Sequence, residues 1–257
     1  MRPFFAILLV GLVLLISAAV VGVASRSADT TPVSLADSVS PRLSPSLGVT
    51  VSLERYDAVQ RAAALDAISA SGFGWVRQRF PWDAIEPKPG AFTWQPWDAI
   101  VQDVTQRNLT LVAVLDGSPG WARAPEDAKN PLAPPQRRAD LGRFAEAFAK
   151  RYGQVLRFYQ VWDEPNIQPH WGQGLVDAAE YAGLLREAAV QLRAADPDAA
   201  ILAAALAPNF EPGGLNQSDI TYLDDLYQAG AAPWFDVVAA QPYGFDRPPS
   251  DLSLIHI

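Results

Sequence analysis

The sequence predicts an α/β fold with a parallel sheet, built as an incomplete (β/α)8 barrel of about six strand–helix units. Six apolar stretches alternate with segments of helical spacing, and paired hairpin signals do not separate them. The spacing of roughly 25–45 residues per unit suits such a barrel. A doubly wound open sheet is the main alternative. It normally carries a glycine-rich turn after its first strand, and residues 49–53 contain none.

The elements follow from these patterns in chain order. The expected strands span residues 48–51, 75–78, 111–115, 156–162, 200–206 and 235–240. The expected helices span residues 57–71, 97–107, 140–152, 177–195 and 219–228. The first helix is read from Val59, Ala63, Leu65 and Ile68, and it ends at Gly72. The stretch 111–115 is continuously apolar, as a strand buried on both faces must be.

The two ends of the chain are expected to lie outside this domain, which covers residues 47–251. Residues 1–24 read as a signal anchor, because Arg2 precedes an apolar run long enough to span a bilayer. A cleaved signal peptide is the alternative, and both readings place the domain outside the cytoplasm. Residues 25–46 are a Ser-, Thr- and Pro-containing linker. Residues 252–257 back-translate into a string resembling a sequencing-library adaptor, which indicates a non-native tail; a short apolar strand is the alternative.

Composition excludes several classes of function. A net charge of −8 argues against nucleic acid as a partner, since phosphate binding needs clustered Lys and Arg. The chain has no cysteine, which excludes disulfides, thiol catalysis and cysteine metal sites. Its two histidines, His170 and His256, leave little for a zinc site, and His170 is expected on a surface loop. The acidic balance is compatible with a neutral substrate such as a glycan.

The most informative stretch is Val161-Trp162-Asp163-Glu164-Pro165-Asn166, which places a carboxylate at the end of the fourth strand. It resembles clan A glycoside hydrolases, the retaining barrel families that include families 5 and 39, whose fourth strand typically ends in Asn-Glu-Pro. The resemblance extends over about residues 47–243, including the loop from Phe80 to Trp94 and Gln241-Pro242-Tyr243. It implies hydrolysis of a β-linked carbohydrate with retention and without a metal or organic cofactor.

The resemblance also assigns roles. Glu164 would be the general acid/base, Arg77 would contact the nucleophile, and the nucleophile would follow a seventh strand beyond this sequence. Further supporting or substrate-binding candidates come from strand ends and aromatic loop residues. They are Asp163, Asn166, Tyr243, Trp82, Asp116, Trp121, Trp171, Asn209 and Gln241. Packing or turn formation is the alternative for the tryptophans, Asp116 and Asn209.

Two departures from the family pattern bear on function. Asp163 stands where the family usually has Asn, so it can accept a hydrogen bond from a sugar 2-hydroxyl but cannot donate one. Gln241 replaces the more usual His. The sequence therefore predicts a membrane-anchored, extracytoplasmic glycoside hydrolase domain, inactive without its seventh strand. A non-catalytic glycan-binding protein is the main alternative, and a structural cell-envelope protein is a third.

Overall fold

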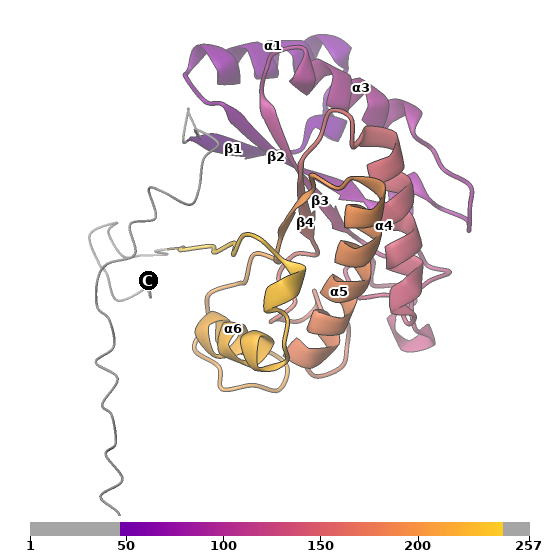
Figure 1. Ribbon diagram of the computed structural model, residues 1–257, viewed down its shortest axis with the longest axis vertical. Helices are drawn as coiled ribbons and strands as arrows, with labels where there is room; N and C mark the ends of the chain where they lie inside the picture. The colour runs from indigo at the N-terminus through magenta and orange to yellow at the C-terminus, as the bar shows by residue number, and fades with distance from the viewer. Residues whose placement is uncertain (1–46, 244–257) are drawn as a thin grey trace, which may run out of the picture. The chain divides into compact units, whose positions relative to one another are not determined.

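The computed structural model describes residues 47–243, and five parallel strands form one sheet at its centre (Figure 1). The strands are β1 Gly48–Val51, β2 Trp75–Pro81, β3 Thr110–Asp116, β4 Phe158–Val161 and β5 Ala200–Leu202, and they lie side by side in chain order. Each neighbouring pair is parallel, as the alternation of strands and helices predicted. Consecutive order in a parallel sheet is the arrangement of a barrel wall rather than of a doubly wound sheet.

Helices connect successive strands. The α-helices are α1 Ala58–Ala70, α2 Trp82–Ile85, α3 Gln95–Thr105, α4 Arg138–Tyr152, α5 Ala178–Ala195 and α6 Asp219–Gln228. Three 3-10 helices, η1 Leu53–Arg55, η2 Pro125–Asp127 and η3 Ala232–Trp234, complete the connections. A capping box at Asp57 and Gln60 starts α1. The predicted apolar face of this helix is only partly correct, because Leu65 is fully buried whereas Val59 is 79% exposed.

The predicted sixth strand is not continuous. The chain returns beside β5 through two isolated parallel bridges, Leu202 to Val237 and Leu206 to Ala240. Val237 remains about two-fifths exposed, so this stretch lacks the two-sided burial that its apolar sequence suggested. The fourth strand is also shorter than predicted at both ends. At its C-terminal end Trp162 adopts a left-handed backbone conformation that ends the extended ladder.

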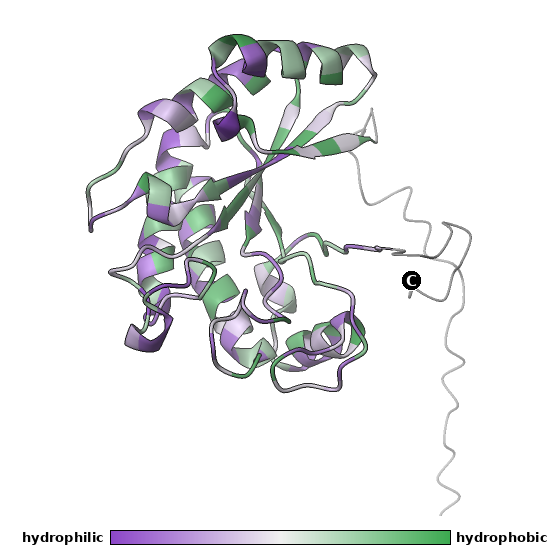
Figure 2. Ribbon diagram, turned by 180° about the vertical axis from the view of Figure 1, so that it is seen from behind, coloured by the Kyte–Doolittle hydropathy of each residue, from purple (hydrophilic) through white to green (hydrophobic). Residues whose placement is uncertain are grey.

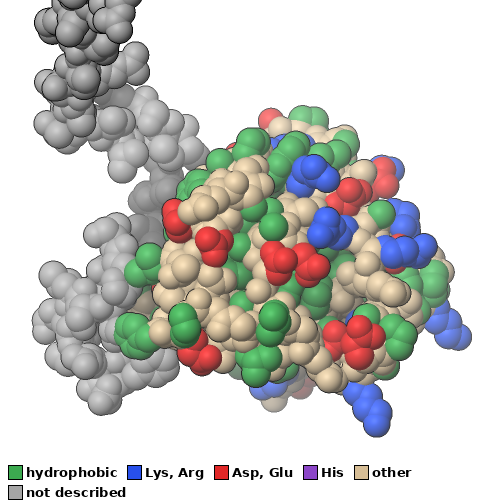
Figure 3. All heavy atoms as spheres, turned by 90° about the horizontal axis from the view of Figure 1, so that it is seen from below, with side chains coloured by type: hydrophobic (Ala, Val, Ile, Leu, Met, Phe, Trp, Pro, Cys, Tyr) green, Lys and Arg blue, Asp and Glu red, His purple; other side chains and the backbone are tan. Residues whose placement is uncertain are grey.

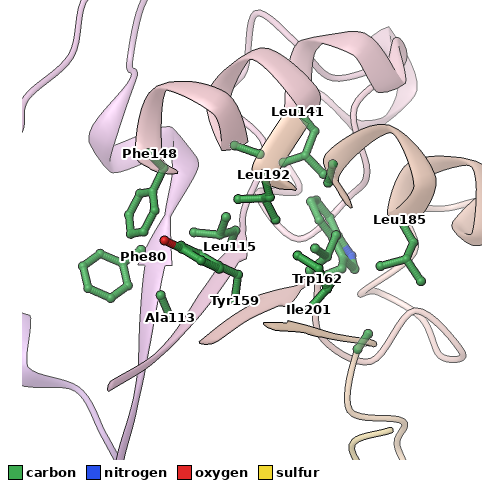
Figure 4. Packing of buried hydrophobic residues seen from close by; sticks show 14 of the residues in the cluster. Phe80, Ala113, Leu115, Leu141, Phe148, Tyr159, Trp162, Leu185, Leu192 and Ile201 are labelled. Atoms are coloured by element: carbon green, nitrogen blue, oxygen red, sulfur yellow. The ribbon is translucent and has the colours of Figure 1, made fainter. Parts of the chain in front are cut away.

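The core lies between the sheet and its outer helices. Phe80 of β2, Tyr159 of β4 and Phe148 of α4 are fully buried, and Phe80 and Phe148 meet edge to face with ring centroids 5.0 Å apart (Figure 4). Hydrophobic residues are concentrated in the central strands (Figure 2). Because strand side chains alternate between faces, this packing turns Arg77 and Arg79 of β2 to the opposite face of the sheet.

The N-terminal apolar segment, the linker and the C-terminal tail lie outside the described residues. Within residues 47–243, helices long and apolar enough to cross a membrane are absent.

Candidate functional site

The turn after β4 presents Glu164 at the carboxyl end of the sheet. Trp162 and Glu164 have φ angles of 70° and 51°, in the left-handed region that costs a non-glycine residue roughly 1–2 kcal/mol. Neighbouring strands hold this backbone, since Trp162 N donates to Leu115 O and Glu164 N to Ala205 O, each at 3.0 Å. Strain that is held by its surroundings is typical of functional positions. The Glu164 side chain is 19% exposed, so it is reachable from solvent yet largely desolvated.

Arg77, Gln160 and Asp163 form one polar network beside this turn. Arg77 donates to Asp163 Oδ1 at 2.7 Å and to Gln160 Oε1 at 3.0 Å. Gln160 Nε2 in turn donates to Asp163 Oδ1 at 3.0 Å and to Trp162 O at 2.8 Å. The structure therefore brings the predicted residues Arg77 and Asp163 together. Gln160 was missed, because nothing in a short buried strand marks an inward-facing amide as part of a site.

A second ion pair lies next to the first. Arg79 Nε donates to both carboxylate oxygens of Asp116, at 2.8 and 3.1 Å. Asp116 is buried at the end of β3, and its burial raises its pKa to about 6 although Arg79 opposes the shift. The alternative role of Asp116 as a capping or turn residue is thus replaced by a buried ion pair. Arg79 was missed in the sequence, although it lies two residues after Arg77 and so on the same face of β2.

His170 lies on the loop after β4, as predicted, and close to Glu164. Its Nε2 is 3.3 Å from Glu164 Oε2, and its Nδ1 is 3.4 Å from Asp163 O. His170 is partly exposed, with 24% of its side chain accessible, and it also approaches Glu164, which the sequence did not indicate.

Asn166 is a structural residue in this fold, which corrects its prediction as a substrate-binding candidate. It is fully buried, and its amide donates to Ala207 O and Gln217 O while its oxygen accepts from Ala207 N. Asn209 likewise donates to the carbonyls of Ala207 and Gln217 and accepts from Glu211 N. Asn166 thus ties the loop after β5 to the turn that carries Glu164, and Asn209 braces that loop from within.

The tryptophans mainly pack the loops. Trp82 is fully buried and donates to Glu86, and Trp171 is 4% exposed, so neither offers an open ring face to a sugar. Trp121 is half-buried, donates to Glu86 O and meets Trp82 edge to face. The packing alternative therefore holds for Trp82 and Trp171, and Trp121 stays a candidate. Phe210, on the loop fastened by the two asparagines, is 78% exposed and was missed.

The remaining predicted residues lie at the end of the described chain. Gln241 donates weakly to Ala205 O at 3.4 Å, and Tyr243 is about half exposed. The face seen in Figure 3 mixes hydrophobic side chains with both acidic and basic ones. Within residues 47–243, groups of three or more acidic or histidine side chains placed to hold a metal ion are absent.

Comparison with solved structures finds a similar fold in several glycoside hydrolases. A family 39 glycoside hydrolase from Bacteroides cellulosilyticus WH2 has 19% identity and a TM-score of 0.60, with 77% of this chain and 38% of that chain covered. A GH39 enzyme from Xanthomonas axonopodis pv. citri has 18% identity and a TM-score of 0.58, with 77% and 40% covered. An exo-β-1,4-mannosidase from Opitutaceae bacterium strain TAV5 has 17% identity and a TM-score of 0.54, covering 77% and 38%.

These likenesses show a shared parallel-sheet α/β fold that corresponds to part of a TIM barrel. The chain spans about two-fifths of the length of the structures it matches. No protein-family model matches the sequence. No curated protein matches it either.

Proposed function

We propose that the protein is a glycoside hydrolase that cleaves a β-linked glycan with retention, with Glu164 as its general acid/base. The observation that carries this proposal is the position of Glu164. It is a partly buried carboxyl group at the carboxyl end of the fourth parallel strand, next to the Arg77–Gln160–Asp163 network. Barrel enzymes build their active sites at that end of the strands. The fold-level likeness to glycoside hydrolases supports the same conclusion.

The chemistry requires such a group. A glycosidic oxygen leaves poorly unless it is protonated as the bond breaks, and a desolvated carboxylic acid supplies that proton. In a retaining enzyme a second carboxylate, about 5–5.5 Å from the first, attacks the anomeric carbon. The described residues hold five strands, and we expect this nucleophile to follow a seventh strand that lies outside them.

Asp163 favours a second candidate function, that of a non-catalytic glycan-binding protein on the same fold. Both hydrogen bonds that the structure gives to this carboxylate reach Oδ1, from Arg77 and Gln160. Oδ2 is then the atom that would accept from a sugar hydroxyl. Such a site recognises a sugar through acceptors, whereas the Asn of related enzymes can also donate.

Hydrolysis assays separate the two functions. The protein extended by its genomic continuation should release phenol from aryl β-glycosides, and Glu164→Gln should lower kcat/KM for 4-nitrophenyl substrates by roughly 10²–10⁴. The loss should be much smaller with 2,4-dinitrophenyl leaving groups, which need little protonation. Glu146 is a partly exposed carboxylate paired with Lys150 on α4, so Glu146→Gln is the matched control and should leave the rate unchanged.

Binding without turnover by the extended protein would support the non-catalytic function, and absence of both on a glycan array would leave the structural cell-envelope role. For the 257-residue chain alone we expect no turnover. We further propose that the apolar N-terminal segment anchors the domain outside the cytoplasm, which protease accessibility on intact cells would test.

A further inference from the structure

We propose that a pocket between α5 and residues 229–234 binds an oxyanion, the carboxylate, phosphate or sulfate group of a small ligand. The pocket has a volume of about 230 Å³, and Arg138, Arg186 and Trp234 line it together with small residues of α5. The lining includes no residue of the turn that carries Glu164. The inference therefore goes beyond the proposed function and does not depend on it.

The charge of this pocket is positive, because the two arginines are its only charged lining residues. Elsewhere the fold pairs its arginines. Within residues 47–243, the arginines that form ion pairs with aspartates are Arg61, Arg77, Arg79, Arg107, Arg137, Arg143, Arg151, Arg157 and Arg193. No ion pair joins Arg138 or Arg186 to an acidic residue of that range. A single exposed arginine is ordinary, but two unpaired guanidinium groups on one pocket without acidic side chains form a site for an anion.

One face of α5 forms the floor of the pocket. Ala179, Ala182, Gly183 and Arg186 are spaced three, four and seven residues along the helix, so they lie on the same face. The first three carry a methyl group or no side chain. They leave space above the helix, and the cationic side chain of Arg186 follows at its edge.

Gly183 makes room for the second arginine. A Cβ atom placed on this glycine would lie 2.5 Å from Nη1 and 2.7 Å from Cζ of Arg138, the first residue of α4. Glycine is the least favourable residue of a helix interior after proline. The sequence thus places a poor helix former at the position where the guanidinium group of Arg138 lies against the backbone of α5.

The opposite wall of the pocket is fastened to the same helix. Arg193 of α5 donates to Pro233 O at 2.8 Å and to the two carboxylate oxygens of Asp236 at 3.0 and 3.1 Å. These bonds hold η3, which carries Trp234, beside α5. Trp234 is half-buried, so its indole gives the pocket an apolar surface close to the two cations.

This combination defines the chemistry of the ligand. Guanidinium groups bind oxyanions well, because their planar N–H donors match pairs of oxygen acceptors. Pockets for drug-sized ligands measure roughly 300–1,000 Å³, so this smaller pocket suits a single phosphate, sulfate or acidic sugar residue. An indole face adds contact area to a sugar ring, which an inorganic anion lacks.

NMR titration of the 257-residue chain tests the proposal without an enzymatic assay. The probes are inorganic phosphate, inorganic sulfate and methyl β-D-glucuronide, and methyl β-D-glucoside is the neutral control. We expect at least one anion to shift the indole signal of Trp234, which Trp234→Phe assigns, with a Kd on the order of 1 mM at low salt. The glucoside should not shift it. The anion that binds most tightly identifies the group that the pocket recognises.

Variants locate the binding in this pocket. Arg138→Gln and Arg186→Gln should each weaken it by roughly three- to tenfold, because each removes one cationic donor. Arg55→Gln is the matched control, since Arg55 lies on η1 and also forms no ion pair within residues 47–243. Gly183→Ala is the sharpest variant. Its Tm should not fall, because alanine favours the helix, whereas displacement of Arg138 should lower the affinity at least about threefold.

The proposal is overturned if none of the three anions saturates at concentrations about tenfold above the expected Kd. It is also overturned if the glucoside binds as well as the anions, or if both glutamine variants bind like wild type. Should a glutamine variant fail to fold, Gly183→Ala decides instead, with an unchanged affinity as the contrary result. A negative hydrolase assay bears on Glu164 alone and leaves the outcome of this titration intact.

Discussion

Replacing Asp116 by Asn should remove a pH dependence of stability that this one carboxyl group imposes. Asp116 is 4% exposed, and its ion pair with Arg79 does not offset the loss of hydration, so its pKa lies near 6 instead of the ordinary 3.8. Asparagine keeps the size of the side chain and cannot ionise. Asp116→Asn therefore mimics the protonated form at every pH.

The magnitude follows from the displacement of the pKa. A shift of about two units corresponds to about 3 kcal/mol at roughly 1.4 kcal/mol per unit. As pH rises from about 3.8 to about 6, the unfolded chain loses this proton first, so the native state binds more protons and the free energy of unfolding falls. The stabilisation is complete below the lower value and is lost as pH passes the upper one.

Urea unfolding between pH 3.5 and 7.5, followed by tryptophan fluorescence, measures this effect. The free energy of unfolding of Asp116→Asn relative to wild type should rise by about 3 kcal/mol across the range. Asp66→Asn is the matched control, because this carboxylate pairs with Arg107 at the surface with its side chain 67% exposed and should follow wild type. If the free energies of unfolding of wild type and Asp116→Asn change in parallel with pH, the reasoning is refuted. A difference between them that falls as pH rises would refute it too.

Two further predictions concern stability. Arg77→Met should cost about 1–3 kcal/mol by leaving Asp163, whose side chain is 15% exposed, without its partner. The double variant Arg77→Met/Asp163→Asn should recover at least half of this loss of unfolding free energy. If the losses of the two single variants, measured by urea unfolding, simply add up in the double variant, the two residues are not coupled. Gly172→Ala should destabilise by at least about 1 kcal/mol more than Gly90→Ala. Both glycines have φ near 75°, which penalises any Cβ, but only at Gly172 does a Cβ meet Asp127, at 2.6 Å. If Gly172→Ala and Gly90→Ala lower Tm by the same amount, the clash with Asp127 is excluded.

The sheet could be predicted from sequence because burial dictates its pattern. The stretch 111–115 is apolar at every position, and it forms most of β3. The same logic failed at 235–240, where apolar residues bridge to β5 at two isolated points and stay partly exposed. An apolar run indicates a strand only where neighbours cover both of its faces.

The site was less predictable, since its contacts join residues that are far apart in the chain. Glu164 could be located because it directly follows a recognisable strand. The structural role of Asn166 depends on Ala207 and Gln217, more than 40 residues away. His170 lies on an irregular loop, where no periodicity indicates which side chain turns back toward Glu164.

The position of Asp163 changes what its replacement of Asn means. An unpaired carboxylate beside Glu164 would favour the protonated acid by charge repulsion. Here Arg77 lies 2.7 Å from Asp163, so the pair adds no net charge to the site. The substitution therefore alters the hydrogen-bonding pattern offered to a sugar more than the electrostatics of the acid. The basic group within ion-pair distance of Glu164 among residues 47–243 is His170, 3.3 Å away, from a loop that the sequence motif does not include.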